Sequence, residues 1–132
     1  MTTTLPSGPQ LAPKDVAAAA QEYWRVAGEI AEVVDWDVVA NSLGLAHGAA
    51  ISAAVLIPKI MQIECVLDTD TELTDAWADL SALVSQGWRV QALLPLPALG
   101  AAHEALRGLD ILLQGWWIAQ GRGLRFTSPE TP

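Results

Sequence analysis

The chain has little of several residue types, and each shortage excludes a class of protein. Its single cysteine, Cys65, cannot form an internal disulfide, which is typical of proteins in a reducing cytoplasm. Its two histidines, His47 and His103, lie far apart, and neither has the neighbouring cysteine or histidine of a zinc site. A glycine-rich phosphate loop and a G-x-S-x-G nucleophile turn are both absent from the sequence. We therefore expect no metal, no cofactor and no catalytic residues, and an interaction protein rather than an enzyme.

Basic residues are also scarce, and this scarcity indicates which classes of partner the chain is suited to bind. Seven bases stand against fifteen acids, giving a formal net charge of −8. Proteins that bind nucleic acids or anionic membranes gain much of their affinity by neutralising phosphates, so this balance disfavours both partners. The charge is uneven, because residues 64–79 hold six acids and no base while four of the seven bases lie in the last third. We expect a protein partner or a second copy of the chain.

Long hydrophobic runs are missing as well. The most apolar stretch, residues 43–57, reads LGLAHGAAISAAVLI, is interrupted by His47 and is followed by Pro58. It is shorter than the ~20 apolar residues that a membrane-spanning helix needs. The opening MTTTLPSGPQ lacks the basic and apolar regions of a signal peptide. These features predict a cytoplasmic protein with no membrane segment.

What the chain does have is apolar content, at 52% of its residues, enough for a folded core. The length of 132 residues is typical of one domain. Residues 1–13, with three prolines and three consecutive threonines, and residues 127–132, TSPETP, have the composition of mobile tails. We place a single α/β domain at residues 14–126.

The first half of this domain predicts helices and leaves one segment undecided. Apolar residues at spacings of three and four predict a long amphipathic helix over residues 15–34, and DVVANSLG at 37–44 predicts a short second helix. Residues 48–57 are uniformly apolar, so a helix and a buried strand are equally compatible with them. Residues 39–55 also resemble a helix-turn-helix, although the helix that would read DNA there has no Arg, Lys, Gln or Asn.

The second half alternates between strands and helices. Period-2 patterns predict strands at 59–67, 88–94, 110–119 and 124–127, and helical patterns lie between them at 72–86 and 97–108. A glycine pair at 121–123 predicts a hairpin turn before the last strand. Such alternation is typical of parallel strands joined by helical crossovers. We expect a mixed, mostly parallel sheet of four to five strands with packed helices, preceded by the long N-terminal helix.

The most chemically suggestive stretch is VLDTDTELTDAW at residues 66–77. DTDTELTD resembles the first motif of the haloacid dehalogenase superfamily, which implies Asp68 as a nucleophile and Asp70 as an acid/base. A structural interpretation also fits, because Thr69 and Glu72 have the spacing of a helix capping box and the later acids follow helical phase. Glu64, Asp68 and Asp70 form our candidate ligand or metal cluster.

A second resemblance covers residues 48–117, whose order of elements is similar to the core of PD-(D/E)xK nuclease-like domains. That resemblance implies that Glu64 corresponds to the glutamate of the E-x-K motif, which helps to bind the metal that activates water. The lysine of the motif would fall at Val66, and the aspartate of the preceding strand would fall at Ala53 or Ala54. The implied function is a nucleic-acid-associated domain whose metal site is lost or is completed by a partner.

Six tryptophans against one phenylalanine and one tyrosine form an unusual aromatic set. Trp116 and Trp117 are consecutive in a predicted strand and must point to opposite faces. One can enter the core, and the other needs cover from the chain itself or from another subunit. With Arg122 and Arg125 on the next strand, this hairpin predicts an interface, since Trp and Arg are enriched at binding hot spots. We expect a non-enzymatic cytoplasmic interaction or regulatory module that forms a homodimer through this hairpin.

Overall fold

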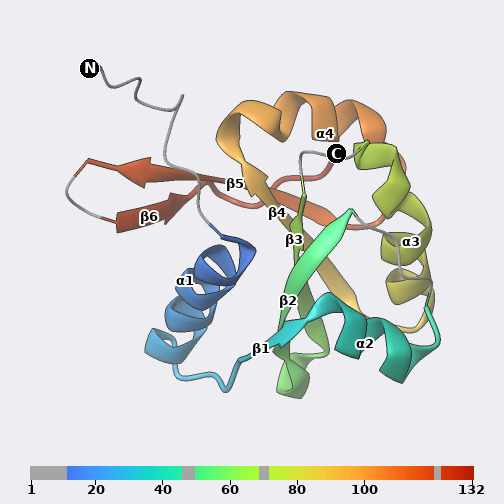
Figure 1. Cartoon of the computed structure of the whole chain (residues 1–132), viewed down its shortest axis with the longest axis horizontal. Helices are drawn as coiled ribbons and strands as arrows, with labels where there is room; N and C mark the ends of the chain where they lie inside the picture. Colours follow the sequence, from blue (N-terminus) through green and yellow to red (C-terminus); the bar gives the residue numbers. More distant parts are fainter. Residues whose placement is uncertain (1–11, 46–49, 69–71, 121–122) are drawn as a thin grey trace.

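Six strands form one curled sheet, a half-barrel in which each strand lies beside its sequence neighbours (Figure 1). The structure, a computed structural model, describes residues 12–45, 50–68, 72–120 and 123–132. Its strands are β1 (Glu32–Asp35), β2 (Ile51–Ile57), β3 (Gln62–Leu67), β4 (Arg89–Pro95), β5 (Leu112–Ala119) and β6 (Gly123–Phe126). The chain is thus a single α/β domain with a mixed sheet, as the sequence predicts at that level.

The prediction of a mostly parallel sheet with four to five strands is wrong. Three of the five neighbouring pairs are antiparallel, and only β3–β4 and β4–β5 are parallel. The reason lies in the connections. β2 turns into β3 through the 3-10 segment Pro58–Ile60 and Met61, whose φ of 54° lies in the left-handed region. So short a link cannot cross over a sheet, and it makes β2 and β3 a hairpin.

The first helix, α1 (Pro13–Val26), is shorter than the predicted helix over 15–34. Gly28 ends it with a φ of +89°, and its N–H donates to Arg25 O at 3.0 Å while Glu29 N–H donates to Trp24 O at 2.9 Å. This is the glycine C-cap arrangement common at helix ends. Beyond it, Ile30 and Ala31 precede β1, an edge strand in which Val33 packs against the same core as α1.

The undecided segment is a strand from Ile51 to Ile57. Helix α2 (Trp36–Leu43) ends at Gly44, whose φ is +69°, and β2 begins at Ile51. Residues 46–49 lie outside the described ranges. The helix-turn-helix resemblance is wrong, because β2 occupies the place of its second helix and pairs with β1 and β3.

The helices cover the two faces of the sheet unequally (Figure 1). Helices α2, α3 (Trp77–Ser85) and α4 (Leu99–Ala105) pack on one face over Ile63, Cys65 and Leu67 of β3. Helix α1 alone packs on the other face, over Val55 and Val66. Within the described ranges, no helix is both long and apolar enough to span a membrane. Three helices therefore cover one face, and the other is covered by a helix only where α1 lies.

The segment after β3 begins with a 3-10 turn, Leu73–Ala76, rather than with α-helix. Four residues at 3.0 per turn advance roughly 80° further around the axis than they would at 3.6 per turn. In the helix that follows, Trp77 is 39% exposed and Asp79 is buried, while Leu80 and Leu83 lie in the core. The capping-box residue Thr69 lies outside the described ranges.

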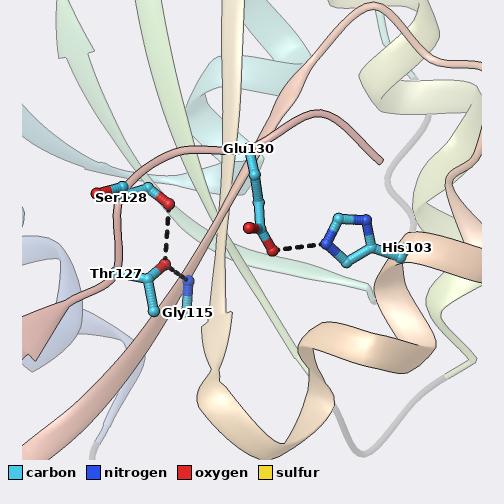
Figure 2. A network of polar contacts seen from close by, with 5 residues as sticks. All are labelled: His103, Gly115, Thr127, Ser128 and Glu130. Atoms are coloured by element: carbon cyan, nitrogen blue, oxygen red, sulfur yellow. Dashed lines mark hydrogen bonds and ion pairs between the residues drawn. The ribbon is translucent and has the colours of Figure 1, made fainter.

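Residues 127–130, where the sequence predicts a mobile tail, lie along β5. Thr127 N–H donates to Gly115 O at 2.8 Å, and Leu113 and Glu130 exchange backbone hydrogen bonds of 2.7 and 2.9 Å. Gly115 N–H also donates to Thr127 Oγ1 at 3.0 Å, and His103 Nε2 contacts Glu130 Oε1 at 2.6 Å (Figure 2). This segment extends the sheet beyond β6 and forms one wall of the site described next.

Candidate functional site

An open groove of about 860 Å³ lies on the sheet face that α1 covers only in part. One wall is α1, through side chains that include Tyr23 and Trp24. The other wall is β6 with the residues that follow it, 124–129. The floor is formed by β3, β4 and β5. We call this feature the α1–β6 groove.

The floor is polar, and strand geometry explains which residues form it. Alternate residues of a strand point to opposite faces. On β3, β4 and β5 the side chains facing α2, α3 and α4 are apolar, whereas four floor residues on the α1 side are polar: Gln62, Glu64, Gln91 and Gln114. Gln62, Glu64 and Gln91 are only 7%, 3% and 6% exposed, although they border an open groove. The groove therefore has a packed, polar base rather than an apolar one.

Three of these floor residues form a chain of hydrogen bonds that we call the glutamine ladder: Gln62, Gln91 and Gln114. Gln62 Nε2 donates to Gln91 Oε1 at 3.5 Å, and Gln91 Nε2 donates to Gln114 Oε1. Gln114 Nε2 then donates to the backbone oxygen of Thr127 at 2.7 Å. The ladder runs diagonally across three strands into the opposite wall and fixes the orientation of every amide in it.

Glu64 lies beside the ladder and links it to α1. Gln62 Nε2 donates to Glu64 Oε2 at 3.1 Å. Burial raises the pKa of the Glu64 carboxyl, and hydrogen bonds from the Trp24 side chain and Gln62 offset this only in part. The one other acid among the described lining residues, Glu22, is paired with Arg25 at 2.5 Å. Among the described lining residues, Glu64 is thus the one buried carboxyl.

The candidate cluster of Glu64, Asp68 and Asp70 is only partly described. Asp68 follows the last residue of β3, so it lies about 13 Å along the strand from Glu64 at 3.3 Å per residue. Asp68 N–H donates to Ala50 O at 2.7 Å. Asp70 lies outside the described ranges. Among the described residues, no three His, Cys, Asp or Glu side chains are grouped so that they could hold a metal ion.

The tryptophan pair on β5 is divided between the two faces, as alternation requires. Trp116 packs against the core under α1, and its indole Nε1 is buried with no hydrogen-bond partner in the part of the chain that the structure describes. Trp117 is 38% exposed and is the register partner of Arg125 on β6. Arg122 lies outside the described ranges. One of the four predicted interface residues is therefore in the core, and Trp117 and Arg125 are accessible.

Sequence reasoning missed the glutamine ladder. The signal is present, because Gln62, Gln91 and Gln114 each occupy an inward position of a predicted strand between apolar neighbours. What the sequence does not supply is the register that brings them together: Gln62 pairs with Arg89 and Leu93 pairs with Gln114. One glutamine in each strand does not predict a contact between them unless the register of the strands is known.

The chain was compared with protein-family models, with curated proteins and with solved structures, and none of the three comparisons finds a match.

Proposed function

We propose that this chain is a non-enzymatic interaction module and that its α1–β6 groove binds a polypeptide segment of a partner protein. The observation that carries the proposal is the glutamine ladder at the base of an open groove. Burying amides and a carboxyl costs free energy even when they are hydrogen-bonded, and apolar side chains usually pack as well or better at such positions. Ordered polar groups in a concave site are what recognition of a ligand requires.

The surroundings of the groove favour a macromolecule over a small molecule. Tyr23 and Val26 on α1 are 66% and 75% exposed, and Leu112 on β5 is 36% exposed. All three line the groove, so apolar surface extends from its floor onto its rim. Contiguous exposed apolar surface with polar residues nearby is typical of protein interaction sites. A small molecule seated on the floor would leave Tyr23 and Val26 uncovered.

The chemistry of the groove supports binding without catalysis. Its described lining contains no histidine and no cysteine, and Glu64 is its one buried acid. Cys65 points to the opposite core, and burial raises the pKa of its thiol, so it is not a nucleophile for this groove. The cytoplasmic location and regulatory role predicted from the sequence belong to the same proposal.

A display library of random peptides selected on the whole chain tests the proposal. Selected peptides should lose at least tenfold in affinity when Leu112→Arg places a charge on the floor, or when Tyr23→Ser removes an aromatic ring from the wall. Trp117→Ser is the matched control, because Trp117 is exposed and lies outside the groove. Fluorescence anisotropy of labelled peptides measures each affinity. No selected binders, or binders insensitive to both groove variants, would refute the proposal.

One observation supports the nuclease-like alternative. Glu64 lies on the groove floor in β3, between its antiparallel neighbour β2 and its parallel neighbour β4. The two other positions do not provide ligands. Val66 and Ala53 are both buried in the apolar core under α1. A metal site would need a second carboxylate from a partner. We therefore rank this alternative below the binding module, and a metal titration described below separates the two.

A further inference from the structure

We propose that the segment bound in the α1–β6 groove presents an acidic side chain, Asp or Glu, to Arg89, with apolar residues on either side of it that cover Tyr23 and Leu112. This inference rests on the proposed binding function and specifies the chemistry of the partner. It is carried by the pairing of charges over the molecule, by the position of Arg89 and by the spare hydrogen-bond donors of the glutamine ladder.

The charges show which cations are already occupied. Lys14 pairs with Asp35 at 3.5 Å, Arg25 with Glu22 at 2.5 Å and Arg107 with Glu104 at 3.8 Å. Among the described residues, Lys59, Arg89 and Arg125 have no ion-pair partner. Lys59 lies outside the groove, and Arg125 is the register partner of Trp117, so Arg89 is the unpaired cation on the groove face. In a chain with fifteen acids and seven bases, an arginine left unpaired in a groove is available to an anion supplied by a partner.

Arg89 is placed to meet such an anion. It is the first residue of β4, it is exposed, and it lies beside Gln62 and two residues before Gln91. Strand alternation therefore puts its side chain on the same face as the glutamine ladder, at the rim of the floor. A guanidinium presents several N–H donors in a planar fork that matches both oxygens of a carboxylate.

The ladder adds neutral donors next to this cation. An amide nitrogen carries two hydrogens. Gln62 uses both, toward Glu64 and Gln91, whereas Gln91 and Gln114 each use one within the ladder. Each therefore keeps a second N–H for a ligand. A carboxylate that reaches the floor beside Arg89 would also meet the spare hydrogen of Gln91, two residues further along β4.

Two opposing charges limit the number of acids in the segment. Glu64 lies on the floor, but its oxygens already receive hydrogen bonds from Gln62 and the Trp24 side chain. The net charge of −8 repels anions in general, but exposed charges are screened beyond about 8 Å at physiological ionic strength. The local pair with Arg89 therefore decides binding, and a segment with one or two acids among apolar residues fits better than a polyacidic tail.

Charge reversal on both partners tests the inference. Peptides from the selection described above are synthesised with amidated C-termini, so that only side chains supply carboxylates. We expect them to share an Asp or Glu between apolar residues and to bind Arg89→Glu at least tenfold more weakly than the unchanged chain. Replacing that acid by Lys should restore binding to Arg89→Glu. Arg107→Glu, which reverses a paired arginine outside the groove lining, should leave binding unchanged.

The outcomes separate this inference from the function beneath it. Two outcomes would overturn the inference of an acidic side chain and leave the groove proposal intact. In the first, peptides depend on Leu112 and Tyr23 but contain no shared acid. In the second, they bind Arg89→Glu as well as the unchanged chain. Peptides that bind only with a free C-terminal carboxylate also overturn the inference. Failure of both groove variants to weaken binding overturns the groove proposal itself.

Discussion

At the scale of single residues, Glu64 joins two parts of the site. It receives a hydrogen bond from Gln62 on its own strand and another from Trp24 on α1, so it ties the floor of the groove to one wall. Its burial, at 3% exposure, makes the charged form unfavourable. The folded state is therefore more stable when Glu64 is neutral than when it is ionised.

Replacing Glu64 by Gln should make stability less dependent on pH. Burial raises the folded-state pKa of Glu64 above the value of 4.5 expected in the unfolded chain, so the folded state binds the proton more tightly. The resulting stability is fully present below the unfolded pKa and is lost as pH rises through the folded pKa. Urea denaturation between pH 4 and pH 8 should show that the free energy of unfolding of Glu64→Gln increases relative to that of the unchanged chain as pH rises.

Glu104→Gln is the matched control for this prediction, because it removes one negative charge from a side chain that is 82% exposed. The difference in free energy of unfolding between Glu104→Gln and the unchanged chain should vary much less with pH than the difference for Glu64→Gln. Equal pH dependence in both variants would contradict the prediction. Repeating the series with Mn²⁺ tests the nuclease-like alternative: a cation bound at Glu64 would raise the stability of the unchanged chain and leave Glu64→Gln unaffected. We expect no such difference.

At the scale of elements, β5 is constrained by close packing at Gly115. A Cβ atom at this position would lie 3.1 Å from Leu96 Cδ1 and 3.3 Å from Leu96 Cα, and the second contact involves backbone that cannot simply rotate away. Gly115→Ala should therefore lower the free energy of unfolding by about 1–3 kcal/mol. Gly100→Ala should leave it unchanged or raise it by up to about 1 kcal/mol, because Gly100 lies in α4 with nothing within 4 Å of the added Cβ.

Chemical denaturation of these two variants provides the measurement, and each serves as the control for the other. Both changes add one methyl group to a glycine, so a difference between them reports the packing of β5 against the 3-10 segment Leu96–Ala98. A Gly115→Ala variant as stable as Gly100→Ala would contradict the close approach. The same approach explains why the sequence has glycine within a strand whose neighbours are bulky.

The elements also show what the sequence can and cannot predict. Beyond Pro58 each strand and helix was predicted in order, because period-2 and period-3.6 patterns are local. The N-terminal part was not, because Ile30, Ala31 and Val34 continue the helical spacing of α1 by coincidence after Gly28 has ended it. Of the residues that line the groove, only Glu64 and Arg125 were among the site residues predicted from the sequence. The glutamine ladder depends on strand register, which is set by contacts between distant segments rather than by local pattern.

At the scale of the whole molecule, the two faces of the β5–β6 hairpin differ in what they offer a partner. On the groove side Trp116 is packed against the core under α1. On the other side Trp117 is 38% exposed beside Arg125, and Leu96 is 40% exposed on the adjoining 3-10 segment. The predicted self-association is therefore assigned to the Trp117 side, which would leave the groove open in a dimer.

A dimer formed this way should be isologous, with Trp117 of each copy near the two-fold axis, since closed two-fold symmetry is the commonest arrangement of soluble oligomers. Light scattering after size exclusion, at protein concentrations up to 100 µM, should give twice the mass of one chain. Trp117→Ser should shift the mass to that of a single chain, because interface tryptophans typically contribute at least about 2 kcal/mol. Tyr23→Ser, which removes an aromatic side chain that is 66% exposed at the groove, should leave the dimer intact. A strict monomer for the unchanged chain would exclude self-association through this face. Loss of the dimer in Tyr23→Ser alone would place the interface at the groove instead. The second copy of the chain would then compete with the acidic segment for the groove.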